Sequence, residues 1–212
     1  MTIAVPAKPG DIFILLQPIL VDKMLLHQYQ LQLQGVFGGE VYEDIHVTCQ
    51  RFSCDDEEKL ARIIYFLSRD WGKLPMFPVF GARLVAFYAD FWESWVVRWE
   101  VADTVAWRRF YNRIGAILGQ YDCEPHYPVT QTPKCSALTA LPEKPTIPTA
   151  YQTSRFLFYA YDLRLTRMTA SGAFETLAQF RLGSDLANES VWFNQDKMEI
   201  GDISRSHSVS DH

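Results

Sequence analysis

Apolar residues recur along this chain with two periods, and each period is typical of one kind of element. Alternation at every second position indicates a strand, and recurrence at every third or fourth position indicates a helix. The segment 41–52 alternates, with a polar side that carries His46, Thr48 and Gln50. Seven segments are predicted as strands on β-rich composition or alternation: 11–20, 41–52, 77–89, 94–102, 134–141, 155–168 and 174–183.

Three segments are predicted as helices, over residues 21–39, 53–72 and 103–121. The first ends at the pair Gly38-Gly39, and glycine commonly ends a helix. Ser53 or Asp55 is the predicted N-cap of the second helix, which has acids in its first turn. Asp103 is the predicted N-cap of the third.

The order of these elements predicts an α+β fold whose sheet has two similar halves. Nothing in the sequence marks an inner boundary, so we expect one domain over residues 1–183. The segment 184–212 loses its periodicity, although Trp192 and Phe193 could attach it to the domain. We expect this C-terminal tail to be partly disordered.

The composition of the chain limits which partners it can bind and in which compartment we expect it. The chain has 212 residues, 48% of them apolar, and a net charge of −5. It has no basic surplus, which argues against binding to duplex DNA. The first apolar run is short and contains Gln17 and Pro18, so it is neither a signal peptide nor a membrane span. We therefore expect a cytoplasmic protein that does not insert into a membrane.

The four cysteines, Cys49, Cys54, Cys123 and Cys135, lack the paired short spacings of a zinc site. Without a secretion signal they are interpreted as reduced thiols. No metal or other cofactor is expected.

His46 and Thr48 are the residues whose chemistry stands out. Residues i and i+2 of a strand point to the same face, so the imidazole and the hydroxyl would lie side by side. An imidazole can accept or donate a proton near neutral pH, and a hydroxyl can donate a hydrogen bond to a phosphoryl oxygen. A histidine placed on a strand for structural reasons would show the same pattern.

The segment "IHVTCQRF" resembles the first of the two His-x-Thr/Ser motifs of the 2H phosphoesterase superfamily, which includes 2′-5′ RNA ligase-like proteins and cyclic phosphodiesterases. The order of elements is similar over residues 11–183, and "YDLRLTRM…GAFETLAQFRLG" resembles the end of the family's domain. The resemblance implies a bilobal fold, with two pseudo-symmetric β-α-β lobes around a central cleft. It also implies metal-independent cleavage of 2′,3′-cyclic or 2′-5′ phosphodiesters, with one histidine as base and the other as acid.

The second motif departs from the family's pattern. The segment "TPKCSALTAL" occupies the expected place, where Ser136 supplies the hydroxyl and Lys134 replaces the histidine. The alternative partner is His126, but Pro128 stands where its threonine or serine belongs, and Thr130 is the nearest hydroxyl. Proline is rare inside a central strand, so we favour Lys134 and Ser136 as the second pair.

A lysine changes what the site can do. Its ordinary pKa near 10.4 makes it a cation at neutral pH and a poor proton shuttle. Burial would lower that pKa and allow proton donation, while the charge alone would still neutralise a phosphate. Lys134 could equally be a solvated residue that precedes a strand.

Aromatic residues and arginines offer a further binding element. Arg98, Arg108 and Arg109 lie in clusters with four tryptophans and could contact a nucleotide, although core aromatics with solvated arginines give the same pattern. Tyr159 and Tyr161 alternate on a predicted strand and are candidate substrate-binding residues in the cleft.

The sequence therefore predicts a phosphodiesterase-like hydrolase acting on nucleotide or RNA phosphodiesters. A second hypothesis is a catalytically silent module on the same fold that binds nucleotide or RNA phosphates. A third is a structural protein without a functional cleft. The sequence predicts neither the exact substrate nor the oligomeric state.

Overall fold

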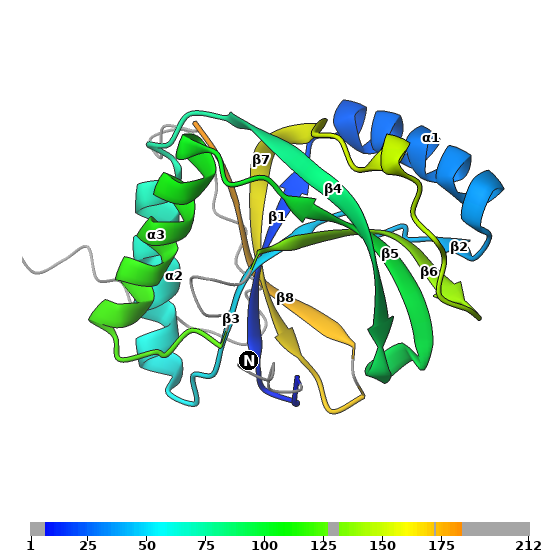
Figure 1. Cartoon of the computed structure of the whole chain (residues 1–212). Helices are drawn as coiled ribbons and strands as arrows, with labels where there is room; N and C mark the ends of the chain where they lie inside the picture. The colour runs from blue at the N-terminus through cyan, green and yellow to red at the C-terminus, as the bar shows by residue number, and fades with distance from the viewer. Residues whose placement is uncertain (1–6, 127–131, 172, 184–212) are drawn as a thin grey trace, which may run out of the picture.

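The structure is a computed structural model that describes residues 7–126, 132–171 and 173–183. Three helices pack on a sheet of eight strands (Figure 1). The helices are α1 (Leu20–Phe37), α2 (Glu57–Trp71) and α3 (Val105–Gln120). The strands are β1 (Ile12–Pro18), β2 (Glu40–Val41), β3 (Val47–Phe52), β4 (Phe77–Ala89), β5 (Ser94–Val101), β6 (Lys134–Leu141), β7 (Arg155–Met168) and β8 (Phe174–Arg181). Two short 3-10 turns are η1 (Asp90–Trp92) and η2 (Thr149–Tyr151).

The strands are paired in the order β1-β3-β6-β5-β4-β7-β8, with β2 beside β6. Every pairing among the described residues is antiparallel. Strand β7 also pairs with β1, so the path of hydrogen bonds returns to its start. The predicted mixed fold, rich in antiparallel strands, is therefore confirmed. The pseudo-symmetry of two lobes stays a prediction.

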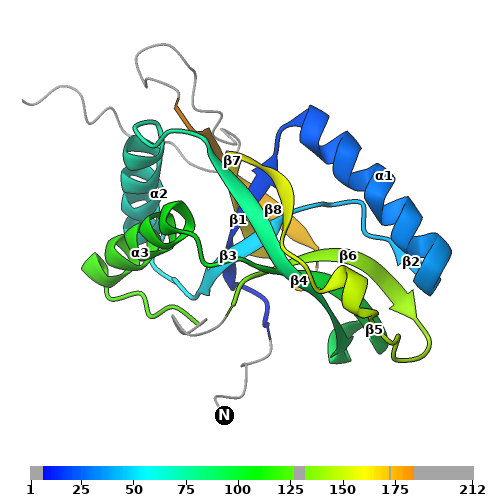
Figure 2. The same cartoon turned by 45° about the horizontal axis from the view of Figure 1, so that its top comes forward.

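The helices lie at two ends of this sheet. Figure 2 shows α2 and α3 side by side at one end and α1 at the other. Helix α1 packs on β6 and β7, α2 on β8, and α3 on β4. The Asp22 carboxylate in the first turn of α1 accepts a hydrogen bond from the Tyr159 N–H at 2.7 Å and so ties α1 to β7.

All the predicted helices and strands form, but the predicted N-caps are wrong. Asp56 caps α2, where its carboxylate accepts from the Lys59 N–H at 3.0 Å. Thr104 caps α3, where its hydroxyl accepts from the Trp107 N–H at 3.1 Å. A cap must immediately precede the first helical residue, and Ser53, Asp55 and Asp103 stand one or more residues too early.

The predicted strand over 41–52 is also too long, because β3 begins only at Val47. The residues before it form a bend in which the Ile45 N–H donates to the Glu43 carbonyl at 3.0 Å. Residues 40 and 41 form the separate strand β2. His46 therefore lies at the point where the bend enters β3.

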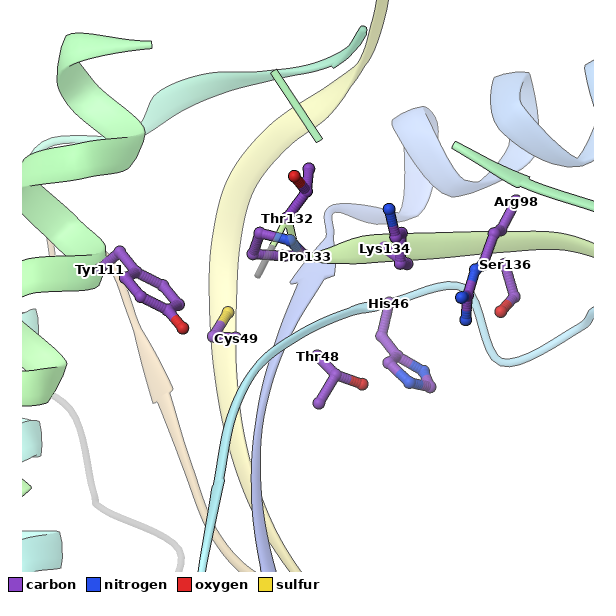
Figure 3. Close-up of a pocket in the computed structure, with 9 residues that line it drawn as sticks. All are labelled: His46, Thr48, Cys49, Arg98, Tyr111, Thr132, Pro133, Lys134 and Ser136. Carbon is purple, nitrogen blue, oxygen red and sulfur yellow. The ribbon is translucent and has the colours of Figure 1, made fainter. Parts of the chain in front are cut away.

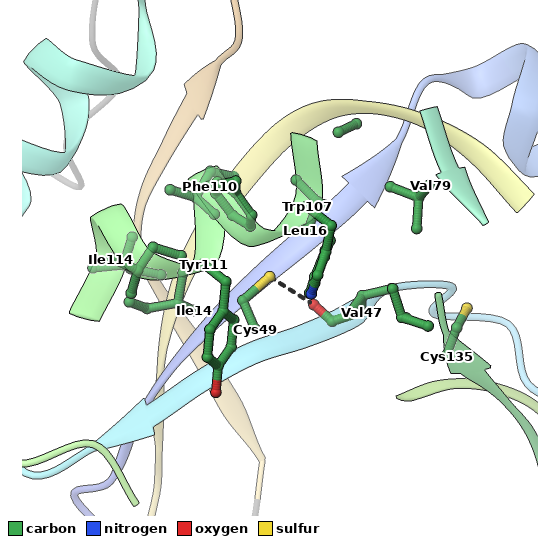
Figure 4. Close-up of a cluster of buried hydrophobic side chains, with 14 of the residues drawn as sticks. Ile14, Leu16, Val47, Cys49, Val79, Trp107, Phe110, Tyr111, Ile114 and Cys135 are labelled. Atoms are coloured by element: carbon green, nitrogen blue, oxygen red, sulfur yellow. Dashed lines mark hydrogen bonds between the residues drawn. The ribbon is translucent and has the colours of Figure 1, made fainter. Parts of the chain in front are cut away.

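The main core lies on one face of β3 and β6. Val47, Cys49 and Cys135 are completely buried there, and Cys49 lies beside aromatic residues of α3 (Figure 4). The Cys49 thiol donates to the Val47 carbonyl at 3.5 Å. Because side chains alternate along a strand, the neighbours of these residues point to the opposite face. That face carries the candidate site.

Candidate functional site

A pocket of about 120 Å³ lies over β3 and β6 and contains both predicted pairs of residues. His46 and Thr48 project from the start of β3, and Lys134 and Ser136 project from β6 (Figure 3). The remaining lining residues come from β3, β5, α3 and the segment before β6: Cys49, Arg98, Tyr111, Thr132 and Pro133.

The strand register explains why these four residues meet. Val47 pairs directly with Cys135 in the antiparallel ladder, and both are buried. Continuing this register by one residue in each direction places His46 opposite Ser136 and Thr48 opposite Lys134. Cross-strand neighbours have Cβ atoms about 5 Å apart, so one small group can contact all four side chains.

The hydrogen bond of His46 fixes the position of its proton. Its Nδ1 lies 2.7 Å from the carbonyl oxygen of Asp44, which can only accept. In the neutral ring Nδ1 therefore carries the hydrogen and Nε2 carries the lone pair. This is the tautomer that a general base acting through Nε2 requires.

The Asp44 carboxylate supports this arrangement. One oxygen lies 3.5 Å from Nδ1 of His46 and 2.9 Å from the guanidinium of Arg164 on β7. The hydrogen bond with His46, together with the charges of His46 and Arg164, lowers the pKa of Asp44 from 3.8 to about 2. The carboxylate is therefore ionised at neutral pH.

Lys134 is partly buried and ion-paired. Its ammonium donates to Glu100 on β5 at 2.5 Å. Burial lowers the pKa of Lys134 below its ordinary 10.5, and the Glu100 carboxylate only partly offsets this effect. Burial alone would raise the pKa of Glu100, but hydrogen bonds from Lys134 and Arg83 outweigh it and the pKa is lowered. The Glu100 carboxylate is therefore ionised at neutral pH.

Arg98 brings a second cation to the pocket. It pairs with Ser136 across β5 and β6, and its guanidinium lies 3.8 Å from the centre of the Phe87 ring. Arg98 is one of the three arginines predicted from the sequence as possible nucleotide contacts. Arg108 is exposed and bonds to Asp103 at 2.6 Å, and neither it nor Arg109 lines the pocket.

Two hydroxyls in the pocket are available to a ligand. Within the described residues, the side chains of Thr48 and Ser136 make no hydrogen bond to the protein. Tyr111 of α3 closes one wall, and its hydroxyl accepts from the Gln50 amide at 3.2 Å. Tyr111 and Thr132 were not predicted from the sequence, because no local pattern places α3 or the segment before β6 at this point.

His126, the alternative partner, lies elsewhere. Its backbone N–H donates to the Arg51 carbonyl at 2.7 Å, and its Nε2 lies 3.2 Å from the Ser53 hydroxyl. Ser53 in turn donates to the buried Asp11 at 2.9 Å. Burial and the charge of Arg51 lower the pKa of His126. His126 is not among the described residues that line the pocket, and Pro128 and Thr130 lie outside the described residues.

Tyr159 and Tyr161 are on β7, as predicted, but neither is among the described residues that line this pocket. Tyr159 is exposed and packs on Phe156, with ring centres 5.2 Å apart. Tyr161 lies beneath the guanidinium of Arg181 at 5.7 Å. Their role in binding a substrate stays a prediction.

The described residues also bear on the predictions about cysteines, metals and membranes. The four cysteines are free and buried. No cluster of three or more His, Cys, Asp and Glu side chains in the described part of the chain is arranged as a set of metal ligands. No helix there is both long and apolar enough to cross a membrane.

Comparison with solved structures identifies the fold. TT0787 of Thermus thermophilus has a TM-score of 0.59 at 14% identity, over 82% of this chain and 99% of that one. E. coli LigT complexed with NADP⁺ has a TM-score of 0.54 at 12% identity, over 83% of this chain and 99% of LigT. A structure described as a phosphoesterase has a TM-score of 0.55 at 13% identity, over 82% of this chain and 99% of that one. The chain has the 2H phosphoesterase fold.

Sequence comparison gives no match. No protein-family model matches this chain, and no curated protein sequence does. The 2H phosphoesterase fold is therefore shown by structure alone. LigT has also been solved in complex with 3′-AMP and with phosphate.

Proposed function

We propose that this protein is a metal-independent phosphodiesterase that acts on 2′,3′-cyclic or 2′-5′ phosphodiesters of nucleotides or RNA. One observation carries the proposal: a single pocket contains an imidazole, two hydroxyls and an ammonium on neighbouring strands. A phosphate accepts hydrogen bonds and carries negative charge, so hydroxyls and an ammonium are suited to bind it. The complexes of LigT with NADP⁺, 3′-AMP and phosphate support a ligand of this class.

The groups of the pocket suggest a division of roles. The hydroxyls of Thr48 and Ser136 donate hydrogen bonds to the non-bridging phosphoryl oxygens, and Arg98 offsets their charge. In hydrolysis of a cyclic phosphate, Nε2 of His46 removes a proton from the attacking water. The new bond joins the water oxygen to phosphorus while one ribose oxygen leaves.

We assign to Lys134 the protonation of the leaving oxygen. Its ammonium can donate a proton more readily than an ordinary lysine, because its pKa is lowered by burial. The product would be the nucleoside monophosphate, with the proton from water held on His46. Proton exchange with solvent then restores both groups. An ammonium is ordinarily a weaker acid than an imidazolium, so we expect slow turnover.

The test is hydrolysis of adenosine 2′,3′-cyclic phosphate, followed by separation of substrate and monophosphate. We expect the wild type to turn over and His46→Ala to lose at least roughly 100-fold in rate, as is typical for a general base. His126→Ala is the matched control and should retain activity. Equal rates for the wild type and His46→Ala would contradict the proposal.

A second function is favoured by the ion pair of Lys134 with Glu100, which holds the ammonium as a fixed charge. A catalytically silent module could use that charge to bind a nucleotide phosphate. Micromolar binding that depends on Lys134, without turnover of a cyclic phosphate, would identify this second function. Absence of both turnover and binding across a panel of nucleotides would exclude both.

A further inference from the structure

Two exposed aromatic side chains of the β4–β5 hairpin contact Arg98 and Tyr42. Phe87 is 43% exposed and Trp92 is 44% exposed. Exposed aromatic rings can serve as surfaces on which nucleic-acid bases stack. These two residues have no part in the chemistry described above, although both connect to residues that do.

Phe87 is linked to the pocket by its contact with Arg98. The guanidinium of Arg98 lies 3.8 Å from the centre of the Phe87 ring, and Arg98 lines the pocket beside Ser136. One face of Phe87 therefore orients a cation of the pocket.

Trp92 is linked to His46 by its contact with Tyr42. The ring centres of Trp92 and Tyr42 are 5.8 Å apart, and those of Tyr42 and His46 are also 5.8 Å apart. Tyr42 thus lies between Trp92 and the imidazole. The two connections place aromatic rings beside the pocket, at Ser136 through Phe87 and at His46 through Tyr42.

We propose that Phe87, Tyr42 and Trp92 form an aromatic platform on which the base of a nucleotide stacks while its phosphate lies between Thr48 and Ser136. This inference rests on the proposed function and specifies where the base of its nucleotide substrate binds. The base of a nucleotide is joined to its phosphate by a single ribose, so a base site must adjoin the phosphate site. Stacking tolerates any base, because every base has a π-face.

The same strand supplies a control. Tyr88 follows Phe87 and is 42% exposed, but successive side chains of a strand point to opposite faces. Its ring packs on Trp95, with centres 5.5 Å apart. Tyr88 therefore matches Phe87 in exposure and aromatic character and differs in the face it occupies.

The test measures binding by calorimetry with two ligands that contain no phosphodiester to cleave. One is adenosine 3′-monophosphate, and the other is the base-free 1-O-methylribose 3-phosphate. We expect the wild type to bind the adenosine ligand about 5- to 150-fold more tightly, the range for stacking of one base. Trp92→Ala and Phe87→Ala should remove most of this preference, whereas Tyr88→Ala should retain it.

The base-free ligand separates failure of the platform from failure of the phosphate site. Because Phe87 supports Arg98, binding of this ligand also reports whether Phe87→Ala disturbs the phosphate contacts. Equal affinity of the wild type for the two ligands would overturn the platform and leave the proposed function standing. An equal loss in Tyr88→Ala would also overturn it. If neither ligand binds the wild type, the platform and the proposed function both fail.

Discussion

Lys134 is the residue on which the chemistry of the pocket most depends, because it faces His46 and Thr48 from the neighbouring strand. A cation there can bind a phosphate whether or not it transfers a proton. Its partial burial and its ion pair with Glu100 act on its pKa in opposite directions, and burial has the larger effect. The side chain is therefore better suited to donate a proton than a solvated lysine, but less suited than a histidine.

Replacement of Lys134 with histidine tests that ranking. Lys134→His would place a second imidazole across from the first, and we expect kcat for a 2′,3′-cyclic nucleotide to rise by roughly 100-fold. Lys134→Gln has no acidic proton, and its kcat should fall below that of the wild type. The measurement is the initial rate near neutral pH. A Lys134→His variant no faster than Lys134→Gln would show that this position does not take part in proton transfer.

Asp44 should make the stability of the protein depend on pH in the acid range. The pKa of Asp44 is about 2 in the folded protein and 3.8 ordinarily. Its contribution to the free energy of unfolding is therefore fully present above about pH 4. That contribution is lost as the pH falls toward about 2, because the folded carboxylate must then be protonated. Asp44→Asn should therefore be less stable than the wild type at neutral pH, with a difference that shrinks between about pH 4 and pH 2.

Urea denaturation at a series of pH values measures this difference. Glu43→Gln removes an exposed acid one residue away and serves as the control, which should follow the wild type at every pH. A difference between Asp44→Asn and the wild type that stays constant throughout this acid range would contradict the role of the Asp44 contacts. Because Asp44 is half exposed, we expect a modest effect.

At the scale of elements, the periodic patterns predicted which helices and strands exist better than they predicted the residues at which these elements begin and end. The strand over 134–141 was placed correctly, since a proline precedes it and apolar residues fill it. The bend before β3 was missed, because its causes are a backbone contact within the bend and the bond from His46 to Asp44. Caps were missed because several acids and hydroxyls precede each helix, and only the geometry decides which one reaches an N–H.

The cap of α3 gives a direct stability test. Thr104→Ala removes the hydroxyl that accepts from Trp107 and should cost about 1 kcal/mol in the free energy of unfolding. Asp103→Ala removes only an exposed ion pair with Arg108 and should cost less than Thr104→Ala. Chemical denaturation measures both. A larger cost for Asp103→Ala than for Thr104→Ala would contradict the assigned cap.

The turn after α1 gives a second test. Gly39 has a φ of +77°, and a Cβ there would lie 2.6 Å from the Thr139 carbonyl oxygen. Gly39→Ala should therefore cost about 2 kcal/mol or more. Gly35 lies nearby in α1, where a Cβ meets nothing within 4 Å, and Gly35→Ala should stabilise by about 0.5–1 kcal/mol. Equal thermal midpoints for the two variants would contradict the close approach of Gly39 to β6.

At the scale of the whole molecule, the site depends on contacts between segments far apart in the sequence. The resemblance to a family suggests that His46 and Lys134 belong together, but no local pattern places β3 beside β6. The presence of Arg98 in the pocket follows from the pairing of β5 with β6, and that of Arg164 beside Asp44 follows from the pairing of β1 with β7. The sequence predicts candidate site residues, but only the order and pairing of the strands determine which of these residues lie on the same face of the sheet.

The proposed function requires that the phosphate of a ligand binds beside His46 and not beside His126. This can be followed directly through the imidazole NMR signals of both residues during titration with adenosine 3′-monophosphate, assigned with His46→Gln and His126→Gln. We expect a large, saturable shift of the His46 signals that is weakened in Lys134→Ala, with little change at His126. Saturable shifts at His126 while the His46 signals stay in place would contradict the proposed site.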